Sequence, residues 1–450
     1  MSSASPAVAD DGPFSSVVVG GGPGGLGPLL WAAQNGLLDA WLEQGVALVE
    51  RTGRLGGTLG RYGICSDSLG GSYLECLEAE ALAPSFHHLR AEPTTIEMQR
   101  YRQSFPPLPL VDHYMGEIGQ TMAATIASHP ASALHLHTTV QSVHLRADGT
   151  VALFARGPDT RPRTLVARSA IIALGGRQPW QEKAPESGLR FPDNVERRVL
   201  SSNVLLTHDG LATANDIIGS AGSRRIVVLG GSHSAYAVAW ALLQLAAAKQ
   251  LGEAQIAIVQ RRPPRIFYPD RAAAVADLYH VASGDICART QRVNRMGGLR
   301  GHGRDMWRQI ACRPGATPEP RVTVLAEQDF SRTELQAMLD EAALVVPCLG
   351  YRSATLPVFD AEGRRLALQA DNNGDAVGGD CRLLLADGSK LPNVFGIGLG
   401  TGFRPTEAMG SEPNFNGQAN SLWLYQNDMG ALIYHAIQAM LAGSETAVAA

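Results

Sequence analysis

A glycine-rich turn near the N-terminus has the spacing that holds a dinucleotide pyrophosphate. It follows a β-branched stretch at 16–19, which predicts a buried strand, and it opens a helical stretch that begins near residue 26. The turn reads Gly20-Gly21-Gly22-Pro23-Gly24-Gly25. The first glycine permits the tight turn, the third lets the backbone approach the pyrophosphate, and the last lets helix and strand pack closely. The helix N-terminus then offers unpaired N–H groups to the phosphates.

An acidic residue stands at the end of the next expected strand. Residues 46–49 predict that strand, and Glu50 follows it, in position to accept hydrogen bonds from ribose hydroxyls. Strand, helix and second strand together predict a parallel sheet. A glycine-rich turn of an unrelated protein is the alternative, and the second strand with its acid disfavours it.

A second strand–turn–helix unit begins at residue 226. Its turn carries Gly230, Ser232 and Ala235, so that serine and alanine replace the second and third glycines of the motif. Arg261 and Arg262 follow the next expected strand, where the 2′-phosphate of NADPH would lie, and planar guanidinium groups suit phosphate. The pattern favours NADPH over NAD, with a solvated basic turn as the alternative.

The residues after Glu50 resemble a known family. Arg51 follows the acid, and Gly57 and Thr58 come soon after. In this the chain resembles the two-dinucleotide-binding-domain flavoproteins, whose first unit ends in Glu-Arg and continues to Gly-Gly-Thr beside the flavin. The resemblance implies that the first nucleotide is FAD.

The resemblance continues at three later positions. By analogy with the family, the backbone of Val140 holds the adenine, Gly175 lies in the crossover motif, and Gly398 lies in the late flavin motif. The family places an aspartate after that glycine for the ribityl chain, whereas this sequence has Leu399. We expect Arg404 or neighbouring N–H groups to take its place.

The stretch that ends in Leu349-Gly350-Tyr351 looks like the returning strand of class B flavin monooxygenases, including the N-hydroxylating ones. The resemblance covers most of residues 14–425. The Baeyer–Villiger fingerprint of the class is absent.

The candidate catalytic residues follow from this resemblance. Cys65 and Ser66 stand where flavin monooxygenases place an Asn-Ser pair near the isoalloxazine, with cysteine in place of asparagine. Asp67 is a candidate base or amine ligand, with a helix cap or turn as the alternative. Asn414 and Asn416 precede a helix that we expect from about 414 to 441, and their amides are candidates for the flavin pyrimidine ring, with ordinary capping as the alternative.

These residues predict an FAD-dependent oxidoreductase. They favour a monooxygenase that depends on NADPH and O2 and acts on the nitrogen of an amino-acid-like amine. The alternatives are an NADPH-dependent flavin reductase, a flavin oxidase, and a non-catalytic flavin-binding sensor. A disulfide reductase needs a cysteine pair against the flavin, and only a Cys65–Cys76 bridge would supply one.

The elements that must position these residues give an α/β fold. We expect two Rossmann-like dinucleotide-binding domains, with the NADPH domain inserted in the FAD domain. The expected divisions are a disordered lead-in at 1–13, a first FAD-binding part at 14–215, an NADPH-binding domain at 216–345, and a returning FAD-binding part with a C-terminal helical region at 346–450.

Bulk composition narrows the partners. The 450 residues are 45% hydrophobic and 18% charged with a formal net charge of −4, which disfavours nucleic acid. Six scattered cysteines without a CxxC pair suit a reducing cytoplasm and give no metal site. The start of the chain does not read as a secretory signal, and no stretch is apolar for long enough to predict a membrane span. A homo-oligomer is compatible with this composition.

Overall fold

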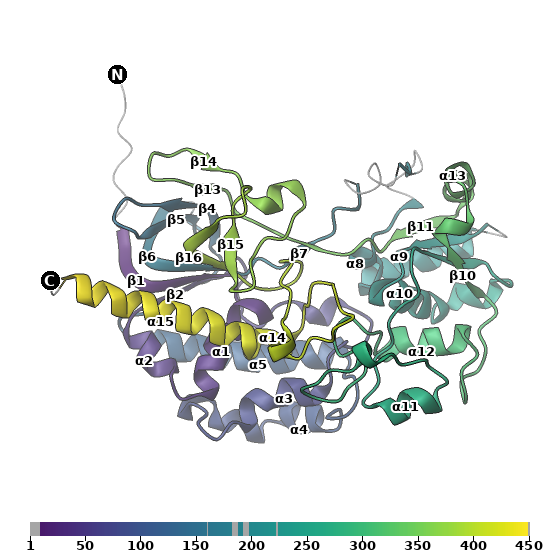
Figure 1. The fold of residues 1–450 in the computed structure, drawn as a ribbon, viewed down its shortest axis with the longest axis horizontal. Helices are drawn as coiled ribbons and strands as arrows, with labels where there is room; N and C mark the ends of the chain where they lie inside the picture. Colours follow the sequence, from purple (N-terminus) through teal and green to yellow (C-terminus); the bar gives the residue numbers. More distant parts are fainter. Residues whose placement is uncertain (1–9, 160, 182–187, 192–197, 222–223, 449–450) are drawn as a thin grey trace.

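The computed structural model describes residues 10–159, 161–181, 188–191, 198–221 and 224–448. They form two large sheets that lie side by side, each with helices packed against it, and one two-stranded sheet (Figure 1). The strands are β1 Asp10–Val19, β2 Val46–Val49, β3 Ala133–His135, β4 Thr139–Leu145, β5 Val151–Arg156, β6 Pro162–Ile172, β7 Gly176–Arg177, β8 Ile226–Leu229, β9 Ile256–Gln260, β10 Val322–Ala326, β11 Leu344–Pro347, β12 Arg352–Ser353, β13 Val358–Phe359, β14 Arg365–Leu366, β15 Arg382–Leu384 and β16 Lys390–Gly396. The α-helices are α1 Pro23–Gln34, α2 Leu38–Glu43, α3 Gly70–Glu78, α4 Pro93–Gln99, α5 Leu108–Ala127, α8 Ser202–Leu205, α9 His208–Gly219, α10 His233–Leu243, α11 Arg271–Ala276, α12 Gly301–Ile310, α13 Arg332–Glu341, α14 Leu422–Gln426 and α15 Asp428–Val448. The 3-10 helices are η1 Leu59–Arg61, η2 Pro84–Ala91, η3 Ala246–Gln250, η4 Ser283–Asp285, η5 Glu327–Asp329, η6 Gln369–Asn372 and η7 Glu407–Met409.

The first sheet joins a parallel part to an antiparallel part. Its strands run in the order β14-β13-β4-β5-β6-β1-β2-β3, and β16 pairs with β6 off this path. The pairs among β3, β2, β1, β6 and β16 are parallel, whereas β4–β5 and β5–β6 are antiparallel. The carboxyl ends of β1, β2, β6 and β16 therefore meet at one edge of the sheet, where parallel sheets bind ligands.

β6 is the strand that links the two parts. It runs from Pro162 to Ile172 without a break, although a polar residue, Ser169, stands in its buried part. Ser169 is fully buried, and its hydroxyl donates to the carbonyl of Ser15 at 3.0 Å and contacts the hydroxyl of Ser16 at 3.1 Å. A polar side chain that is hydrogen bonded in this way can continue a buried strand.

Helices cover the parallel part of this sheet. α1 packs against α15, where the rings of Trp31 and Tyr434 lie 5.1 Å apart. The segment 52–110 also contributes helices, since α3, α4, η1 and η2 form within it. Gly70 and Pro93 stand at the starts of α3 and α4, where glycine and proline are compatible with helix.

The second sheet is parallel and buried on both faces. Its order is β10-β9-β8-β11. Along β8, Ile226 and Val228 pack with α9, α10 and α12, whereas Val227 and Leu229 pack with α13. This alternation follows from the two-residue period of a strand and gives helices on both sides of the sheet.

Two short strands connect the first half of the molecule, which contains the first sheet, to the second half, which contains the second sheet. β7 leads out of the first sheet, β12 leads back, and they pair with each other in antiparallel register. β11, at Leu344–Pro347, belongs to the second sheet, so the boundary that we expected at 345 falls within a strand. The division into FAD-binding and NADPH-binding domains stays a prediction.

The two ends of the chain differ from expectation. Residues 10–13, which we expected to be disordered, belong to β1, where Asp10 pairs with Thr164, and residues 1–9 lie outside the described ranges. The helix expected from about residue 414 begins only at Leu422, and Asn427 separates α14 from α15.

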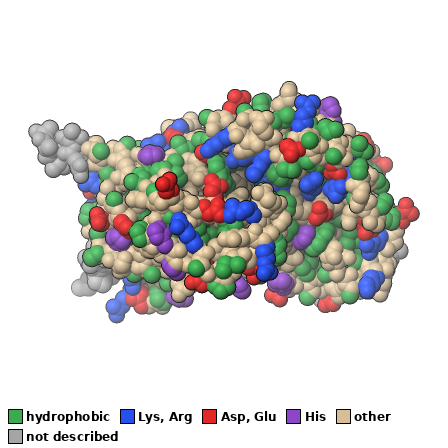
Figure 2. Space-filling model, turned by 90° about the horizontal axis from the view of Figure 1, so that it is seen from below, with side chains coloured by type: hydrophobic (Ala, Val, Ile, Leu, Met, Phe, Trp, Pro, Cys, Tyr) green, Lys and Arg blue, Asp and Glu red, His purple; other side chains and the backbone are tan. Residues whose placement is uncertain are grey.

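The surface carries charged side chains of both signs. On the face that Figure 2 shows, Lys and Arg side chains are interspersed with Asp and Glu side chains. Within the described ranges, no helix combines the length and the apolar composition that crossing a membrane requires.

Candidate functional site

The first glycine turn is shaped by three close backbone approaches. A Cβ on Gly25 would lie 1.8 Å from the carbonyl oxygen of Gly20, and one on Gly20 would lie 2.3 Å from that of Ala173. Gly20 also has φ +103°, a conformation that favours glycine. A Cβ on Gly24 would lie 3.1 Å from the Cα of Gly398. These contacts bring β1, α1 and the ends of β6 and β16 together.

Open space lies in front of the same turn. A Cβ on Gly22, Gly175 or Gly398 would meet no heavy atom within 4 Å, although their neighbours are tightly packed. The first N–H groups of α1 point out of the helix end, as at every helix N-terminus. This cradle, with glycine backbone on three sides and unpaired donors at one end, fits a dinucleotide pyrophosphate.

Glu50 is fixed at the edge of this space. One carboxylate oxygen accepts the N–H of Gly21 at 2.7 Å, and the other accepts the N–H of Thr52 at 2.8 Å. The side chain is buried. Each oxygen keeps a lone pair for a further donor, so the carboxylate can still bind a ribose diol.

The remaining flavin candidates lie around the same edge. Gly57 has φ +92°, and a Cβ there would lie 3.1 Å from the ring of Pro23. Arg51 and Thr58 are exposed, and Val140 is buried in β4. Thr138, two residues before Val140, donates its N–H to the carbonyl of Glu50.

Leu399 stands where the family pattern has an aspartate. Backbone N–H groups are the hydrogen-bonding groups that remain at this place. Arg404, one expected substitute, is engaged elsewhere, since it pairs with Asp375 at 3.1 Å and donates to the carbonyl of Asn416 at 2.9 Å. The N–H groups of Gly398 and Leu399 make no hydrogen bond with any described residue. They are therefore available to a ligand.

The second turn repeats the close backbone approach of the first. Gly230 has φ +133°, and a Cβ there would lie 2.5 Å from the carbonyl oxygen of Cys348. Ser232 is the N-cap residue of α10 without a capping side-chain hydrogen bond, and Ala235 is fully buried in that helix. Its small side chain lets α10 approach the sheet, as the third glycine of the motif does.

Arg261 and Arg262 follow β9 as expected. Both are exposed, and neither guanidinium forms an ion pair with the described part of the chain. Two unpaired guanidinium groups beside a nucleotide turn suit a phosphate group.

The three catalytic candidates share one loop but differ in surroundings. Ser66 is buried, and its hydroxyl contacts the hydroxyl of Tyr73 at 2.8 Å and accepts the N–H of Ser68 at 2.9 Å. These bonds hold the loop before α3. Asp67 is exposed, and its carboxylate has no hydrogen bond or ion pair with a described residue.

Cys65 faces the second half of the molecule. Its thiol accepts the N–H of His302 at 3.4 Å, and its own N–H donates to Nδ1 of His302 at 3.3 Å. Burial raises the pKa of the Cys65 thiol to about 11. Cys65 is therefore a neutral thiol at physiological pH and a poor nucleophile.

Arg300 and His233 of the second half lie near Asp67. Arg300 donates to the main-chain carbonyl of Asp67 at 3.1 Å and lies over the ring of Phe267 at 4.2 Å. Burial lowers the pKa of Arg300 to about 10, and the Asp67 carboxylate opposes this shift. Burial also lowers the pKa of His233, which starts α10, and the Asp67 carboxylate again opposes the shift. Asp67 thus ends the loop at 62–67, which we call the flavin-side loop, near the first residues of α10 and α12.

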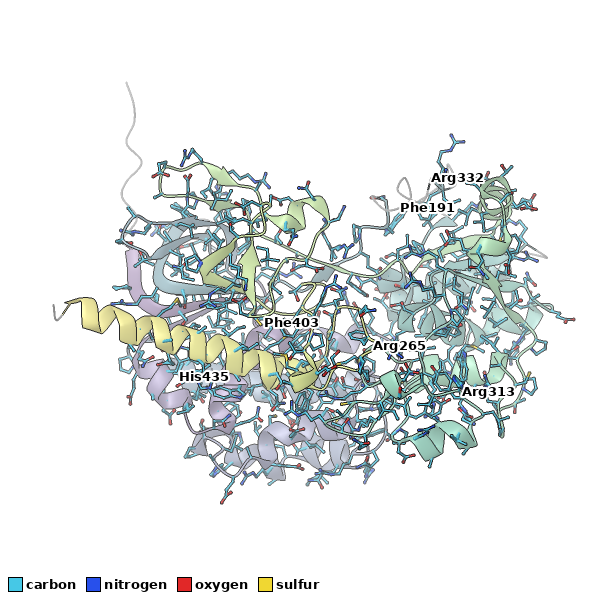
Figure 3. The ribbon with its side chains drawn as sticks, viewed as in Figure 1. Phe191, Arg265, Arg313, Arg332, Phe403 and His435 are labelled. Atoms are coloured by element: carbon cyan, nitrogen blue, oxygen red, sulfur yellow. The ribbon has the colours of Figure 1, made fainter. Side chains whose placement is uncertain are left out.

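Asn414 and Asn416 do not stand at a helix N-terminus. The side chain of Asn414 donates to Asp285 at 3.0 Å, and its carbonyl accepts from Arg265 at 2.6 Å. Figure 3 shows Arg265 at the junction of the two halves. Asn416 is exposed.

Two other amide side chains bind the turn at 398–402, which we call the late flavin turn. Asn420 accepts the N–H of Gly400, and Gln418 accepts the N–H of Gly402, both at 3.0 Å. No local pattern in the sequence distinguishes these amides from those of Asn414 and Asn416. Arg300 and His302 were also missed, because they lie far along the chain from the loop that they contact.

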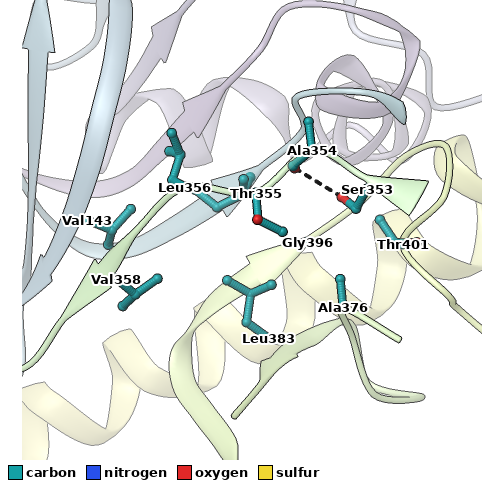
Figure 4. Close-up of a pocket in the computed structure, with 11 residues that line it drawn as sticks. Val143, Ser353, Ala354, Thr355, Leu356, Val358, Ala376, Leu383, Gly396 and Thr401 are labelled. Carbon is teal, nitrogen blue, oxygen red and sulfur yellow. Dashed lines mark hydrogen bonds between the residues drawn. The ribbon is translucent and has the colours of Figure 1, made fainter. Parts of the chain in front are cut away.

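A small cavity lies behind the late flavin turn (Figure 4). Apolar side chains line most of it, and the hydroxyl of Ser353 donates to the carbonyl of Ala354 at its edge. The cavity measures about 10 Å³, which is about the space that one water needs. It is a gap in packing and not a substrate pocket.

Comparison with known proteins gives one relative of substantial identity. No protein-family model matches the chain. Over 444 residues it is 34% identical to CMP-5′-(3-aminopropyl)phosphonate hydroxylase of Streptomyces rubellomurinus, covering 96% of this chain and 98% of the relative.

Solved structures share the fold. The FAD-bound cadaverine monooxygenase of Erwinia amylovora has a TM-score of 0.53 and 13% identity, covering 95% of this chain and 94% of that one. The L-lysine 6-monooxygenase of Pseudomonas syringae has a TM-score of 0.53 and 14% identity, covering 95% and 99%. Ornithine hydroxylase of Pseudomonas aeruginosa has a TM-score of 0.52 and 14% identity, covering 97% and 100%.

Two glycine variants separate folding from flavin binding. Gly22→Ala should leave the unfolding temperature of the flavin-free protein unchanged, because its methyl group meets open space, but should sharply lower flavin content. Gly25→Ala should destabilise the flavin-free protein by on the order of 2 kcal/mol, because its methyl group meets backbone. Thermal unfolding and flavin absorbance of the purified proteins measure both effects. Full flavin content in Gly22→Ala would refute the assignment of this turn.

Proposed function

Because this chain belongs to the two-dinucleotide-binding-domain flavoproteins of the class B monooxygenase kind, we propose that it uses FAD, NADPH and O2 to hydroxylate the nitrogen of a small primary amine. In this reaction one oxygen atom of O2 enters a new N–O bond and the other leaves as water. NADPH supplies the two electrons that balance the reaction. The carrying observation is that the unpaired Asp67 carboxylate, on the flavin-side loop, interacts electrostatically with His233 at the second glycine turn.

FAD, once bound, supplies hydride acceptance and oxygen activation. The N-terminus of α1 and the open glycine positions Gly22, Gly175 and Gly398 bind its phosphates and ribityl chain. Glu50 binds the ribose hydroxyls, with its orientation set by the N–H groups of Gly21 and Thr52. The N–H groups of Gly398 and Leu399 replace the aspartate of the family pattern.

The second glycine turn and its arginines bind NADPH. The N-terminus of α10 faces the pyrophosphate, and Arg261 and Arg262 pair with the 2′-phosphate. Both guanidinium groups carry full charge at neutral pH and donate in a planar array, which matches phosphate oxygens.

The relatives point to the substrate class. The relative in Streptomyces is named for an aminopropylphosphonate linked to CMP, and the three structures are named for cadaverine, lysine and ornithine. Each of these molecules ends in a primary amine. An ammonium group must lose a proton before its nitrogen can form the N–O bond, and the exposed Asp67 carboxylate is placed to bind the ammonium and accept that proton.

The cysteines argue against a disulfide reductase. Cys65 and Cys76 are free thiols with separate partners, since Cys76 donates to the carbonyl of Tyr73 at 3.2 Å and Cys65 contacts His302. Burial raises the pKa of Cys76 to about 12, as it raises that of Cys65 to about 11. Neither thiol ionises readily enough for thiol–disulfide exchange at neutral pH.

Product analysis tests the reaction itself. The FAD-loaded protein, given NADPH and isotopically labelled O2, should convert a primary amine to a hydroxylamine that carries one labelled oxygen. Mass spectrometry of products from aminopropylphosphonate, its CMP conjugate, lysine, ornithine and cadaverine identifies the amine. NADPH consumption that yields hydrogen peroxide with every amine, and no hydroxylamine, would identify a flavin oxidase instead.

The arginine pair can be tested by cofactor preference. Replacing Arg261 and Arg262 together by Ala should raise KM for NADPH about 100-fold, since two charge-assisted contacts are lost, and should leave KM for NADH nearly unchanged. Arg271→Ala, an exposed arginine of the same half, is the matched control. Equal rises in both KM values would show that the pair does not bind the 2′-phosphate.

The role of Asp67 can be separated from that of the cofactors. Asp67→Asn should lower kcat/KM for the amine about 100-fold, because the amide cannot accept the proton, while the rate of anaerobic flavin reduction by NADPH stays unchanged. Glu253→Gln, an exposed carboxylate of the second half, is the control. A parallel loss of flavin reduction in Asp67→Asn would place Asp67 at the cofactors and not at the amine.

A further inference from the structure

Cys65 and His302 form a two-bond contact across the junction of the two halves, which we call the Cys65–His302 clasp. The N–H of Cys65 donates to Nδ1 of His302 at 3.3 Å, and the N–H of His302 donates to the thiol of Cys65 at 3.4 Å. Cys65 lies on the loop between η1 and α3 of the first half, and His302 lies in the first turn of α12 of the second half. The two residues are 237 positions apart in the chain.

The imidazole of His302 is held in one orientation. Its ring stacks on Trp240 of α10, with ring centroids 3.4 Å apart and planes 8° from parallel. Because Nδ1 accepts a hydrogen bond, the proton of the neutral ring resides on Nε2. Burial, with the neighbouring His233, lowers the pKa of His302 to about 4, so the ring is neutral at physiological pH and Nδ1 remains an acceptor.

The backbone of the first turn of α12 lies close to both the clasp and the second nucleotide turn. Gly301 has φ +47°, and a Cβ there would lie 2.6 Å from the sulfur of Cys65. A Cβ on Gly303 would lie 3.4 Å from Nδ1 of His233, in the second nucleotide turn. The first turn of α12 is therefore packed between the flavin-side loop and that nucleotide turn.

The rest of the loop is attached on both sides of the clasp. Gly63 donates its N–H to the carbonyl of Leu206 in the second half at 3.0 Å, and the carbonyl of Asp67 accepts from Arg300. Between these two points, the N–H of Cys65 has His302 as its partner. The clasp thus holds the centre of this loop to the second half, while Ile64 and Ser66 bond to residues 106–108 of the first half.

We propose that His302 is a positioning residue of the monooxygenase reaction, whose Nδ1 holds the N–H of Cys65 and so keeps the loop from Tyr62 to Asp67 closed over the flavin. The proposal rests on the proposed function, since it takes that loop to border the isoalloxazine. A closed loop excludes water while oxygen reacts, and exclusion of water limits the release of hydrogen peroxide. Loss of the acceptor opens the loop and lets NADPH oxidation proceed without hydroxylation.

Three substitutions separate the acceptor from the ring. In His302→Asn the amide oxygen stands near the place of Nδ1 and keeps an acceptor for Cys65. In His302→Gln the amide reaches the place of Nε2 and the acceptor beside Cys65 is lost. His302→Phe keeps a flat ring against Trp240 but has no acceptor. His280→Asn, an exposed histidine of the same half, is the matched control.

Two measurements on the FAD-loaded protein judge the proposal. The first is the hydrogen peroxide formed per NADPH consumed in the presence of the amine. The second is the hydrogen–deuterium exchange rate of the amides at 62–67, which needs no turnover. His302→Gln and His302→Phe should raise exchange about tenfold and raise peroxide yield, because one hydrogen bond is lost. His302→Asn should resemble the unchanged protein in both.

The outcomes distinguish the proposal from its alternatives. If His302→Phe keeps slow exchange and low peroxide yield, stacking on Trp240 fixes the loop and the proposal is wrong. If all three variants exchange equally fast, the acceptor is not the cause, and the proposal is again wrong. If the unchanged protein forms no hydroxylamine with any amine, the proposed function fails, whereas the exchange rates still decide whether Nδ1 of His302 holds the loop.

Discussion

The first half of the molecule depends on the contact of glycine backbone with backbone at the carboxyl end of β1. Gly25 lies so close to Gly20, and Gly20 so close to Ala173, that any side chain there would overlap a carbonyl group. This contact draws the N-terminus of α1 against the ends of β1, β6 and β16. The unpaired N–H groups of the helix therefore open onto the same crevice as Gly22 and Gly398. The binding geometry is a consequence of packing that only glycine permits.

The second half repeats this arrangement and faces the first. Gly230 approaches the carbonyl of Cys348 as Gly20 approaches that of Ala173. Covalent connection between the halves runs through the chain segments of β7 and β12, and noncovalent contacts must set the rest of their relative placement. The Cys65–His302 clasp and the bond from Arg300 to Asp67 are two of these contacts. They join the flavin-side loop to the first turn of α12, which also packs against the second nucleotide turn.

Arginines hold the segment between β9 and α12 against the C-terminal part of the chain. The guanidinium groups of Arg289 and Arg295 lie 5.0 and 4.8 Å from the ring of Trp423, and Arg289 also pairs with Asp428 at 3.1 Å. Glu412 is buried beside them and accepts the N–H of Met296 at 3.1 Å, and its burial raises its pKa. Such contacts substitute for regular secondary structure, because a buried irregular backbone must find polar partners among side chains.

The sequence by itself determined the two nucleotide turns, the strands that precede them, Glu50, and the family. These features depend on short-range rules: a strand of period two, a glycine that must lack a side chain, and a helix that begins directly after it. The tertiary structure decided which side chains reach the junction. Asn420 and Gln418 contact the late flavin turn instead of Asn414 and Asn416, and His302 contacts Cys65. Such partners are set by where distant segments of the chain pack against one another, which no local pattern encodes.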